Sequence, residues 1–405
     1  MPDWFYIIWF FLVGSCIGSF LNVVVYRLPR GQSLVHPPSR CPRCEHPLAW
    51  YDNVPVLGWI FLRGKCRYCH EPISPRYPIV EGICGTLFAL FYVAIFIFHQ
   101  GPFWPVMGHD GNWAQPLRME SPGNDWPIFG LYLVAVSTLL AASLIDAELY
   151  LIPMALPAIM AGVGVVVHTF VDRVGVPGAL IAPAPCLALA AGAGIGLLIS
   201  LVLLRLGIFP LSFAEGEPAL EIDRRNKKAE DEAPPEYTPS QVRREIAKEM
   251  LFLLPPLLLG GLAVVLQMDG WPLHGVWAEV ARIDWVGGLL GSLLGGLVGG
   301  GMIWITRVVF SYLFGREAMG LGDIDLMFAI GTVIGPGASV AVFFIAPFFG
   351  IPVPLTLYFL KSRHELPYGP YLSIAAVVLM LFYYPIYAAF APGLMNVGVF
   401  LRSLI

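Results

Sequence analysis

The stretch from Glu317 to Leu326 reads EAMGLGDIDL. Its glycines Gly320 and Gly322 permit a close approach of the backbone that a side chain would block. Asp323 follows at the start of a long apolar run, where a carboxylate is costly and by default marks a functional site. The alternative is that Asp323 caps the helix that follows. A second carboxylate at the same membrane level would favour chemistry over capping.

The composition is that of a polytopic membrane protein. Of the 405 residues, 57% are hydrophobic and 13% charged, and the mean hydropathy is +0.72. We predict an all-α fold with about ten transmembrane helices and a small cytoplasmic zinc-binding domain between the first two. The expected spans are 4–26, 78–98, 127–145, 152–171, 179–206, 251–268, 285–305, 326–336, 338–360 and 371–390.

The predicted organisation has five parts. They are the first transmembrane helix (1–26), a cytoplasmic four-cysteine domain (27–77), transmembrane helices 2–5 with Asp146 (78–206), a charged cytoplasmic linker (207–249), and transmembrane helices 6–10 (250–405). The last part contains the GxGD motif, Gly320 to Asp323. The linker is rich in Pro, Glu, Lys and Arg, so we expect it to be flexible, with a short helix near 239–248.

The distribution of basic residues predicts the orientation. Twenty Lys and Arg residues fall on one side, in 27–77, in 205–249 and at Arg307, Arg316, Lys361 and Arg363. The other side has four. Because basic loops stay in the cytoplasm, we expect both termini to lie outside it.

A second carboxylate is predicted on the same side. Asp146 ends the third span, where a carboxylate opposes the helix dipole and is poorly explained as a stabilising feature. Its alternative role is a solvated interfacial charge. With Asp323 it is typical of an aspartic-protease dyad, in which one carboxyl holds a proton while its partner activates water.

Two rows of small residues mark the seventh span. Gly287, Gly291, Gly295 and Gly299 recur every four residues, beside a row formed by Gly288, Ser292, Gly296 and Gly300. Small residues at this spacing let helices approach closely in lipid. We expect tight helix packing here.

Four of the seven cysteines form two Cys-x-x-Cys pairs. Cys41 and Cys44 are separated by 21 residues from Cys66 and Cys69, close to the spacing of a tetrahedral zinc site. Zinc would hold this short segment in shape, and the predicted cytoplasmic location argues against disulfides. A redox role is the alternative, and His46 or His70 could replace a ligand. We expect Cys16, Cys84 and Cys186 to be packing residues.

Taken together, these features resemble the type IV prepilin leader peptidases, a family of GxGD-class membrane aspartic proteases with N-methyltransferase activity. The resemblance covers about 1–160 and 284–390. The motifs that carry it are Gly18–Pro29, Ser39–Cys44, Trp50–Val56, Leu62–Cys69, Arg76–Glu81, Asp146 with Ile152-Pro153, Gly320–Asp323 and Pro367–Pro370.

The resemblance implies cleavage of the leader of type IV prepilins or type II secretion pseudopilins at the cytoplasmic face, followed by N-methylation from S-adenosylmethionine. It implies Asp146 and Asp323 as the catalytic pair and Cys41, Cys44, Cys66 and Cys69 as zinc ligands. Residues that bind the methyl donor are not identified, although Glu81 is the best single candidate for a charged role. The expected location is the inner membrane. The expected partners are prepilin-like substrates and lipid, with no nucleic acid, and the 207–249 linker is a candidate docking segment.

Three departures from the family pattern leave alternatives open. Met154 stands where the family usually has aspartate, Asp325 stands where it usually has lysine, and three spans instead of one separate the Ile-Pro motif from GxGD. The extra hairpin preserves the orientation of everything after it. A protease without methyl transfer, a catalytically silent assembly factor and a transporter remain alternative interpretations.

Overall fold

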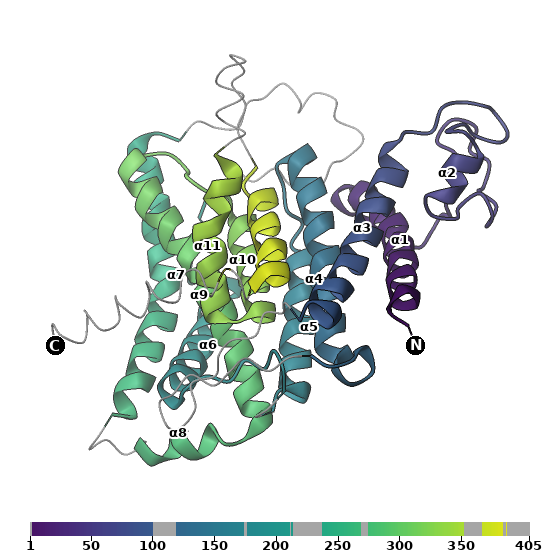
Figure 1. Ribbon diagram of the computed structural model, residues 1–405. Helices are drawn as coiled ribbons and strands as arrows, with labels where there is room; N and C mark the ends of the chain where they lie inside the picture. Colours follow the sequence, from purple (N-terminus) through teal and green to yellow (C-terminus); the bar gives the residue numbers. More distant parts are fainter. Residues whose placement is uncertain are drawn as a thin grey trace.

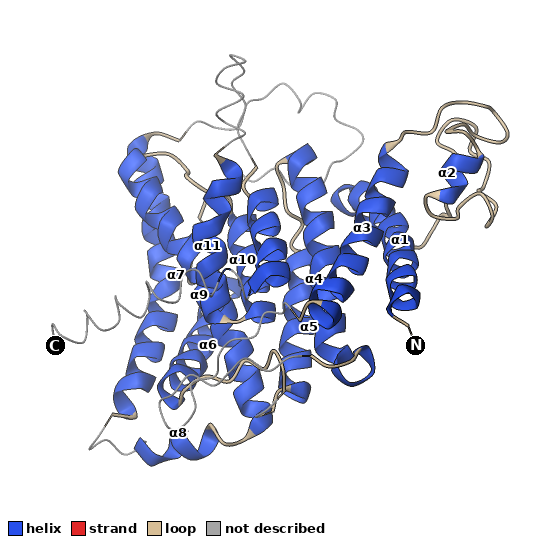
Figure 2. Ribbon diagram, viewed as in Figure 1, coloured by secondary structure: helices blue, strands red, loops and turns tan. Residues whose placement is uncertain are grey.

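The computed structural model describes residues 2–99, 119–173, 176–210, 212–213, 237–268, 274–351, 367–383 and 386. Within this part of the chain the structure is helical and has no β-strand (Figure 2). The labelled helices are α1 (Asp3–Arg27), η1 (Leu28–Arg30), α2 (Leu57–Phe61), α3 (Arg76–Tyr92), η2 (Val93–Ile97), α4 (Pro122–Leu149), α5 (Ala155–Val171), α6 (Ala184–Arg205), α7 (Pro239–Leu266), α8 (His274–Val280), α9 (Asp284–Phe314), α10 (Leu321–Ile334) and α11 (Pro336–Gly350). A further helix covers Gly369–Tyr383.

The all-helical membrane class is confirmed. Of the described helices, six are long and apolar enough to cross a membrane, namely α1 with η1, α3 with η2, α4, α6, α7 and α9. Helices satisfy their own backbone hydrogen bonds, which lipid cannot do for them. The helices α5, α11 and Gly369–Tyr383 are shorter, and α10 has 14 residues. Each of the ten expected spans overlaps one of these helices. Because only six of the described helices are long and apolar enough to cross a membrane, the number of ten crossings stays a prediction. Parts of the last two expected spans, at 352–360, 384–385 and 387–390, lie outside the described residues.

The helices form a bundle, and the four-cysteine segment, Cys41–Cys69, lies beside one end of it (Figure 1). The helices α1 and α3 pack along each other, and α4 joins them to the rest. The helix α9 contacts α5, α6, α7, α10 and α11. It is therefore the element around which the second half of the chain assembles.

The glycine rows of α9 account for this central position. A Cβ on Gly288 would collide with the carbonyl of His168 in α5, and one on Gly291 with the carbonyl of Leu180. A Cβ on Gly295 would collide with the carbonyl of Gly331 in α10, where the same holds in reverse. The tight packing expected from the sequence is confirmed, and it brings α10 against α9 backbone to backbone.

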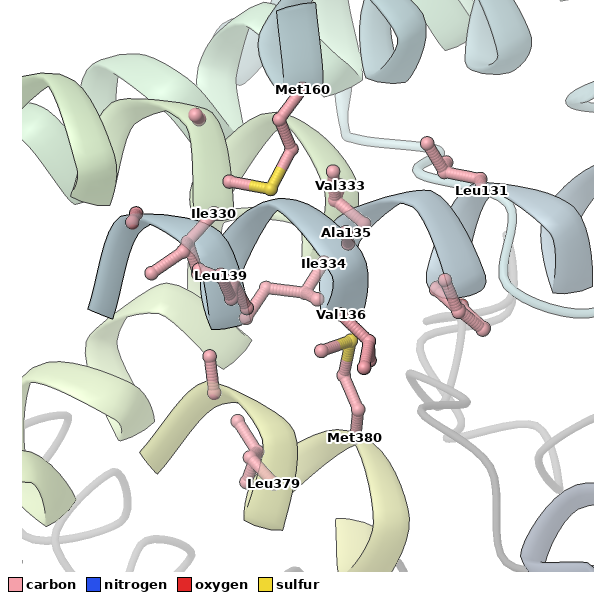
Figure 3. Close-up of a cluster of buried hydrophobic side chains, with 14 of the residues drawn as sticks. Leu131, Ala135, Val136, Leu139, Met160, Ile330, Val333, Ile334, Leu379 and Met380 are labelled. Carbon is pink, nitrogen blue, oxygen red and sulfur yellow. The ribbon is translucent and has the colours of Figure 1, made fainter. Parts of the chain in front are cut away.

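The core between the helices is apolar. Figure 3 shows side chains of α4, α5, α10 and Gly369–Tyr383 meeting in one cluster. Its labelled members are Leu131, Ala135, Val136, Leu139, Met160, Ile330, Val333, Ile334, Leu379 and Met380. These contacts join the helix that ends near Asp146 to the helix that begins near Asp323.

In the hairpin formed by α6 and α7, the helix α7 begins at Pro239, earlier than the expected span 251–268. The short helix predicted near 239–248 and the sixth span are one continuous helix. Thr238 and Gln241 form a capping box at its start, which satisfies exposed backbone groups. Val242 and Ile246 are buried against Phe213, so the charged segment still has an apolar face. Residues 214–236 of the expected flexible linker lie outside the described residues.

The glycine contact predicts a stability difference between two positions of one helix. Gly295→Ala will lower the free energy of unfolding by about 1–3 kcal/mol, because its Cβ collides with the α10 backbone. Gly301→Ala is the matched control, since its Cβ would enter open space. Thermal unfolding in detergent measures both variants. Equal unfolding temperatures would contradict the account.

Candidate functional site

Asp146 lies in the last turn of α4 with its carboxylate turned inward. The residue is 6% exposed, so it is not a solvated interfacial charge. The backbone N–H of Gly369 donates a hydrogen bond of 3.1 Å to its Oδ2. A Cβ on Gly369 would stand 2.6 Å from that oxygen, so only glycine lets the backbone come this close. This contact places the motif Pro367–Pro370 directly against Asp146.

Asp323 lies in the first turn of α10 and is 8% exposed. Gly320, and not Asp323, occupies the N-cap, and no side-chain hydrogen bond caps the helix. Asp323 lies three residues later, in the first turn, where the helix dipole favours a carboxylate. The charge of Asp146 also acts on Asp323.

The two aspartate segments meet at Ile152. The side chain of Ile152 lies 3.0 Å from a Cβ built on Gly322 and 2.9 Å from one built on Gly369. The Ile-Pro motif thus fills the space between the GxGD turn and the residue that binds Asp146. Two carboxylates that are 177 residues apart in the chain come together at one end of the bundle.

The two positions that depart from the family pattern have different environments. Met154 is 70% exposed at the start of α5. Asp325 is partly buried, two residues after Asp323, where a helix points its side chain in a different direction. Both positions therefore stand beside the aspartate pair rather than within it.

The four cysteines of the four-cysteine segment converge. Their sulfur atoms all lie within 4.8 Å of one another. Each pair sits in the same kind of turn: Cys41 N–H donates to the carbonyl of His46, and Cys66 N–H to that of Glu71. Two isolated bridges, Arg40 with Pro47 and Lys65 with Pro72, close these turns.

The geometry fits a tetrahedral metal ion. The Sγ atoms of Cys41 and Cys69 are 3.8 Å apart, and those of Cys44 and Cys66 are 4.0 Å apart. Zinc–sulfur bonds of about 2.3 Å in a tetrahedron require a sulfur–sulfur distance of about 3.8 Å. His46 instead packs on the ring of Tyr68, with centroids 3.6 Å apart. The four thiols therefore suffice to bind a metal such as zinc.

A cavity of about 1040 Å³ lies between the four-cysteine segment and the helices α1 and α3. Its wall combines apolar side chains with polar and charged ones, which include Asn22, Arg27, Asp52 and Glu81. Glu81 is 8% exposed and accepts the backbone N–H of Val56 at 2.7 Å. The volume is at the upper end of the range of small-molecule sites.

Ion pairs secure this part of the chain. Asp52 accepts two hydrogen bonds from Arg67, at 2.5 and 3.0 Å to its Oδ1, and this pairing raises the pKa of the Arg67 guanidinium. Arg76, at the start of α3, forms an ion pair with Glu148, two residues after Asp146. The exit from the four-cysteine segment is therefore attached to the end of α4 that carries the first aspartate.

Sequence reasoning missed three contributors to this region. Gly369 was recognised only within a motif, without a role. Glu249 was assigned to a flexible linker, yet it is 3% exposed and pairs with the fully buried Arg307. Arg307 entered only the count of basic residues that predicts the membrane orientation. No pattern in the sequence indicated its partner.

Two family models match the chain. The bacterial peptidase A24 N-terminal domain matches residues 12–95, and the type IV leader peptidase family matches residues 252–355. The first range contains the four cysteines and most of the cavity wall. The second contains the GxGD motif.

Several curated proteins named prepilin leader peptidase/N-methyltransferase are similar to parts of the chain. The one from Myxococcus xanthus is 54% identical over 91 residues, which are 22% of this chain and 27% of that protein. The one from Klebsiella pneumoniae is 39% identical over 160 residues, 38% of this chain and 58% of that protein. The one from Stutzerimonas stutzeri is 31% identical over 182 residues, which are 39% of this chain and 53% of that protein.

The chain thus spans between about a quarter and three-fifths of the length of these relatives. No solved structure matches it. The two models match in the order in which the sequence motifs occur, and both matched ranges contain residues of the sites described above. Two parts of the chain are therefore similar to the type IV leader peptidase family: residues 12–95 to its bacterial A24 N-terminal domain and residues 252–355 to the peptidase family model.

Proposed function

We propose that this chain removes the leader peptide of type IV prepilins or type II secretion pseudopilins and then N-methylates the new N-terminal residue. One observation carries the proposal: two buried carboxylates, Asp146 and Asp323, lie at one end of a membrane helix bundle, where Ile152 packs between Gly322 and Gly369. The family and the two activities in the relatives' name support it.

Hydrolysis would use the two aspartates as a pair. Like charges at short range favour a state in which the pair shares one proton. The ionised carboxylate takes a proton from water, which attacks the scissile carbonyl, while the protonated carboxyl donates to the carbonyl oxygen. Collapse of the tetrahedral intermediate breaks the peptide bond, and the leaving amine takes up a proton.

A backbone group restrains the first of these carboxyl groups. The Gly369 N–H donates to Oδ2 of Asp146, which restricts the rotamers of Asp146 while leaving acceptor capacity for water and substrate. Such restraint is what a preorganised catalytic pair requires.

We assign methyl transfer to the cavity between the four-cysteine segment and α1 and α3. S-adenosylmethionine, when bound there, would supply an electrophilic methyl group to the new amine. Glu81 would accept the proton that the amine loses, since Val56 N–H occupies one of its oxygens and leaves the other available. Zinc on the four cysteines would keep the cavity wall in shape.

The protein is an integral protein of the inner membrane, as its apolar helices and its family indicate. We propose that the dyad and the four-cysteine segment face the cytoplasm, because the basic residues concentrate on that side. Both termini would then lie outside the cytoplasm. Substrate would reach the pair from lipid, with its basic leader in the cytoplasm.

The dyad can be tested with one matched control. Asp146→Asn and Asp323→Asn will each lower leader cleavage of a purified prepilin by at least about 100-fold, because neither neutral amide can exchange the required proton. Asp325→Asn, two residues from Asp323, will retain cleavage within a few-fold. Cleavage is measured as product formed with time by the purified protein in detergent. Retained activity in either of the first two variants would contradict the mechanism and favour a non-catalytic membrane factor.

The metal site predicts a separation of the two activities. We expect one zinc ion per molecule of the unmutated protein and much less than one in Cys66→Ser. This variant will also lose most methyl transfer, because the cavity wall loses its shape without zinc. Leader cleavage will fall at most a few-fold, since the dyad lies on helices held by other contacts. Cys186→Ser, on α6 outside the four-cysteine segment, is the control. Zinc is measured by elemental analysis, and the two products by intact mass. Full zinc content in Cys66→Ser would refute the assignment.

A further inference from the structure

The side chain of Arg307 is fully buried in α9, seven residues before the helix ends. Burying a guanidinium is unfavourable unless its donors are paired. Here the donors face in two directions. One edge contacts Glu249, with Nε 3.1 Å and Nη2 3.0 Å from Oε1. The other nitrogen, Nη1, donates to Glu317 Oε1 at 2.6 Å and to the carbonyl oxygen of Met319.

These acceptors belong to two different parts of the chain. Glu249 is on α7, in the hairpin that α6 and α7 form. Glu317 and Met319 are in the segment between α9 and α10, and Met319 directly precedes the N-cap Gly320. Arg307 therefore connects the hairpin of α6 and α7 to the turn that presents Asp323.

Glu249 has an environment that favours a fixed carboxylate. It is 3% exposed, and Trp304 Nε1 donates to its Oε2 at 3.0 Å. With the two nitrogens of Arg307, three donors hold the carboxylate. Because a guanidinium is planar and rigid, fixing one edge also fixes the direction of Nη1 on the other edge.

The hairpin also covers Arg307 from a further side. The ring of Phe213 lies over the guanidinium, 5.1 Å from centroid to Cζ. Glu245 of α7 holds Phe213 by accepting its backbone N–H at 2.8 Å. The hairpin therefore restrains the guanidinium in two ways: Glu249 binds its edge, and Phe213 covers its face.

A second contact set ties the same turn to α9. Ser311 Oγ accepts the backbone N–H of Ala318 at 3.0 Å. The segment before α10 is thus held by α9 directly and, through Arg307, by α7. The positive charge of Arg307 also acts on Asp323.

We propose that Glu249 is a positioning residue for Asp323. It orients Arg307, which holds Glu317 and the Met319 carbonyl and thereby sets the start of α10. The hairpin of α6 and α7 is then a support of the protease site. This inference rests on the proposed function only for its kinetic consequence, because the positioning itself is a property of the fold.

The test compares Glu249→Gln with a control in the same hairpin. Ser200→Ala removes the buried hydrogen bond from Ser200 Oγ to the Phe252 carbonyl, which joins α6 to α7 without touching Arg307. Glu249→Gln will lower kcat for cleavage of a purified prepilin at least about tenfold, with KM changed less than about twofold, since small displacements of catalytic groups are costly. Ser200→Ala will leave both constants unchanged. Glu249→Asp, which keeps the charge on a shorter side chain, will lower kcat less than Glu249→Gln.

Two further measurements distinguish positioning from general destabilisation. Backbone amide hydrogen exchange at residues 316–320 will be faster in Glu249→Gln and unchanged in Ser200→Ala. If Glu249 acts through Arg307, the double variant Glu249→Gln/Arg307→Gln will be no slower than Arg307→Gln alone. Unchanged exchange in Glu249→Gln, or kcat losses that multiply in the double variant, would overturn the inference.

The outcomes also separate this inference from the proposed function. If the unmutated chain cleaves no prepilin, the proposed function fails, while exchange at residues 316–320 still decides whether Glu249 positions the turn. If Glu249→Gln does not accumulate, Glu249→Asp decides, with slower cleavage and faster exchange expected. Wild-type values for both in Glu249→Asp would then refute the inference.

Discussion

The backbone contact between α9 and α10 is the constraint on which the rest of the structure depends. At Gly295 and Gly331 the two helices approach so closely that neither position has room for a Cβ. Lipid offers little hydrophobic force between helices, so such close packing supplies much of their association. It sets the place of α10, and with it the depth at which Asp323 lies opposite the end of α4.

Charged groups then gather at one end of this packed frame. Asp146, Asp323, Glu249 and Arg307 are all less than a tenth exposed, and Asp146, Glu249 and Arg307 each have a hydrogen-bond partner. Buried charges without partners are strongly unfavourable, so their concentration here indicates a function that requires them. On our proposal two of the four perform the chemistry and the other two hold the turn in place.

The sequence was most informative where spacing has a direct structural meaning. Apolar runs predicted ten of the helices but neither α2 nor α8. Glycines four residues apart predicted close packing, and two Cys-x-x-Cys pairs predicted a converged cluster, since each pattern acts locally or through a simple geometric rule. The partners of Glu249 and Gly369 depend on contacts 58 and 223 residues away, which no local pattern encodes. The charged composition of 239–249 resembled a solvated linker, because its buried face consists of only a few residues, such as Val242 and Ile246.

On our proposal, Asp146 and Asp323 act together on a tetrahedral intermediate. The most direct measurement is the affinity of a prepilin leader peptide whose scissile amide is replaced by a non-cleavable hydroxyl group that mimics this intermediate. We predict that the unmutated protein in nanodiscs binds it at least about 100-fold more tightly than the ordinary peptide, and that Asp146→Asn or Asp323→Asn abolishes the difference. Equal affinity of the unmutated protein for both peptides would contradict the account.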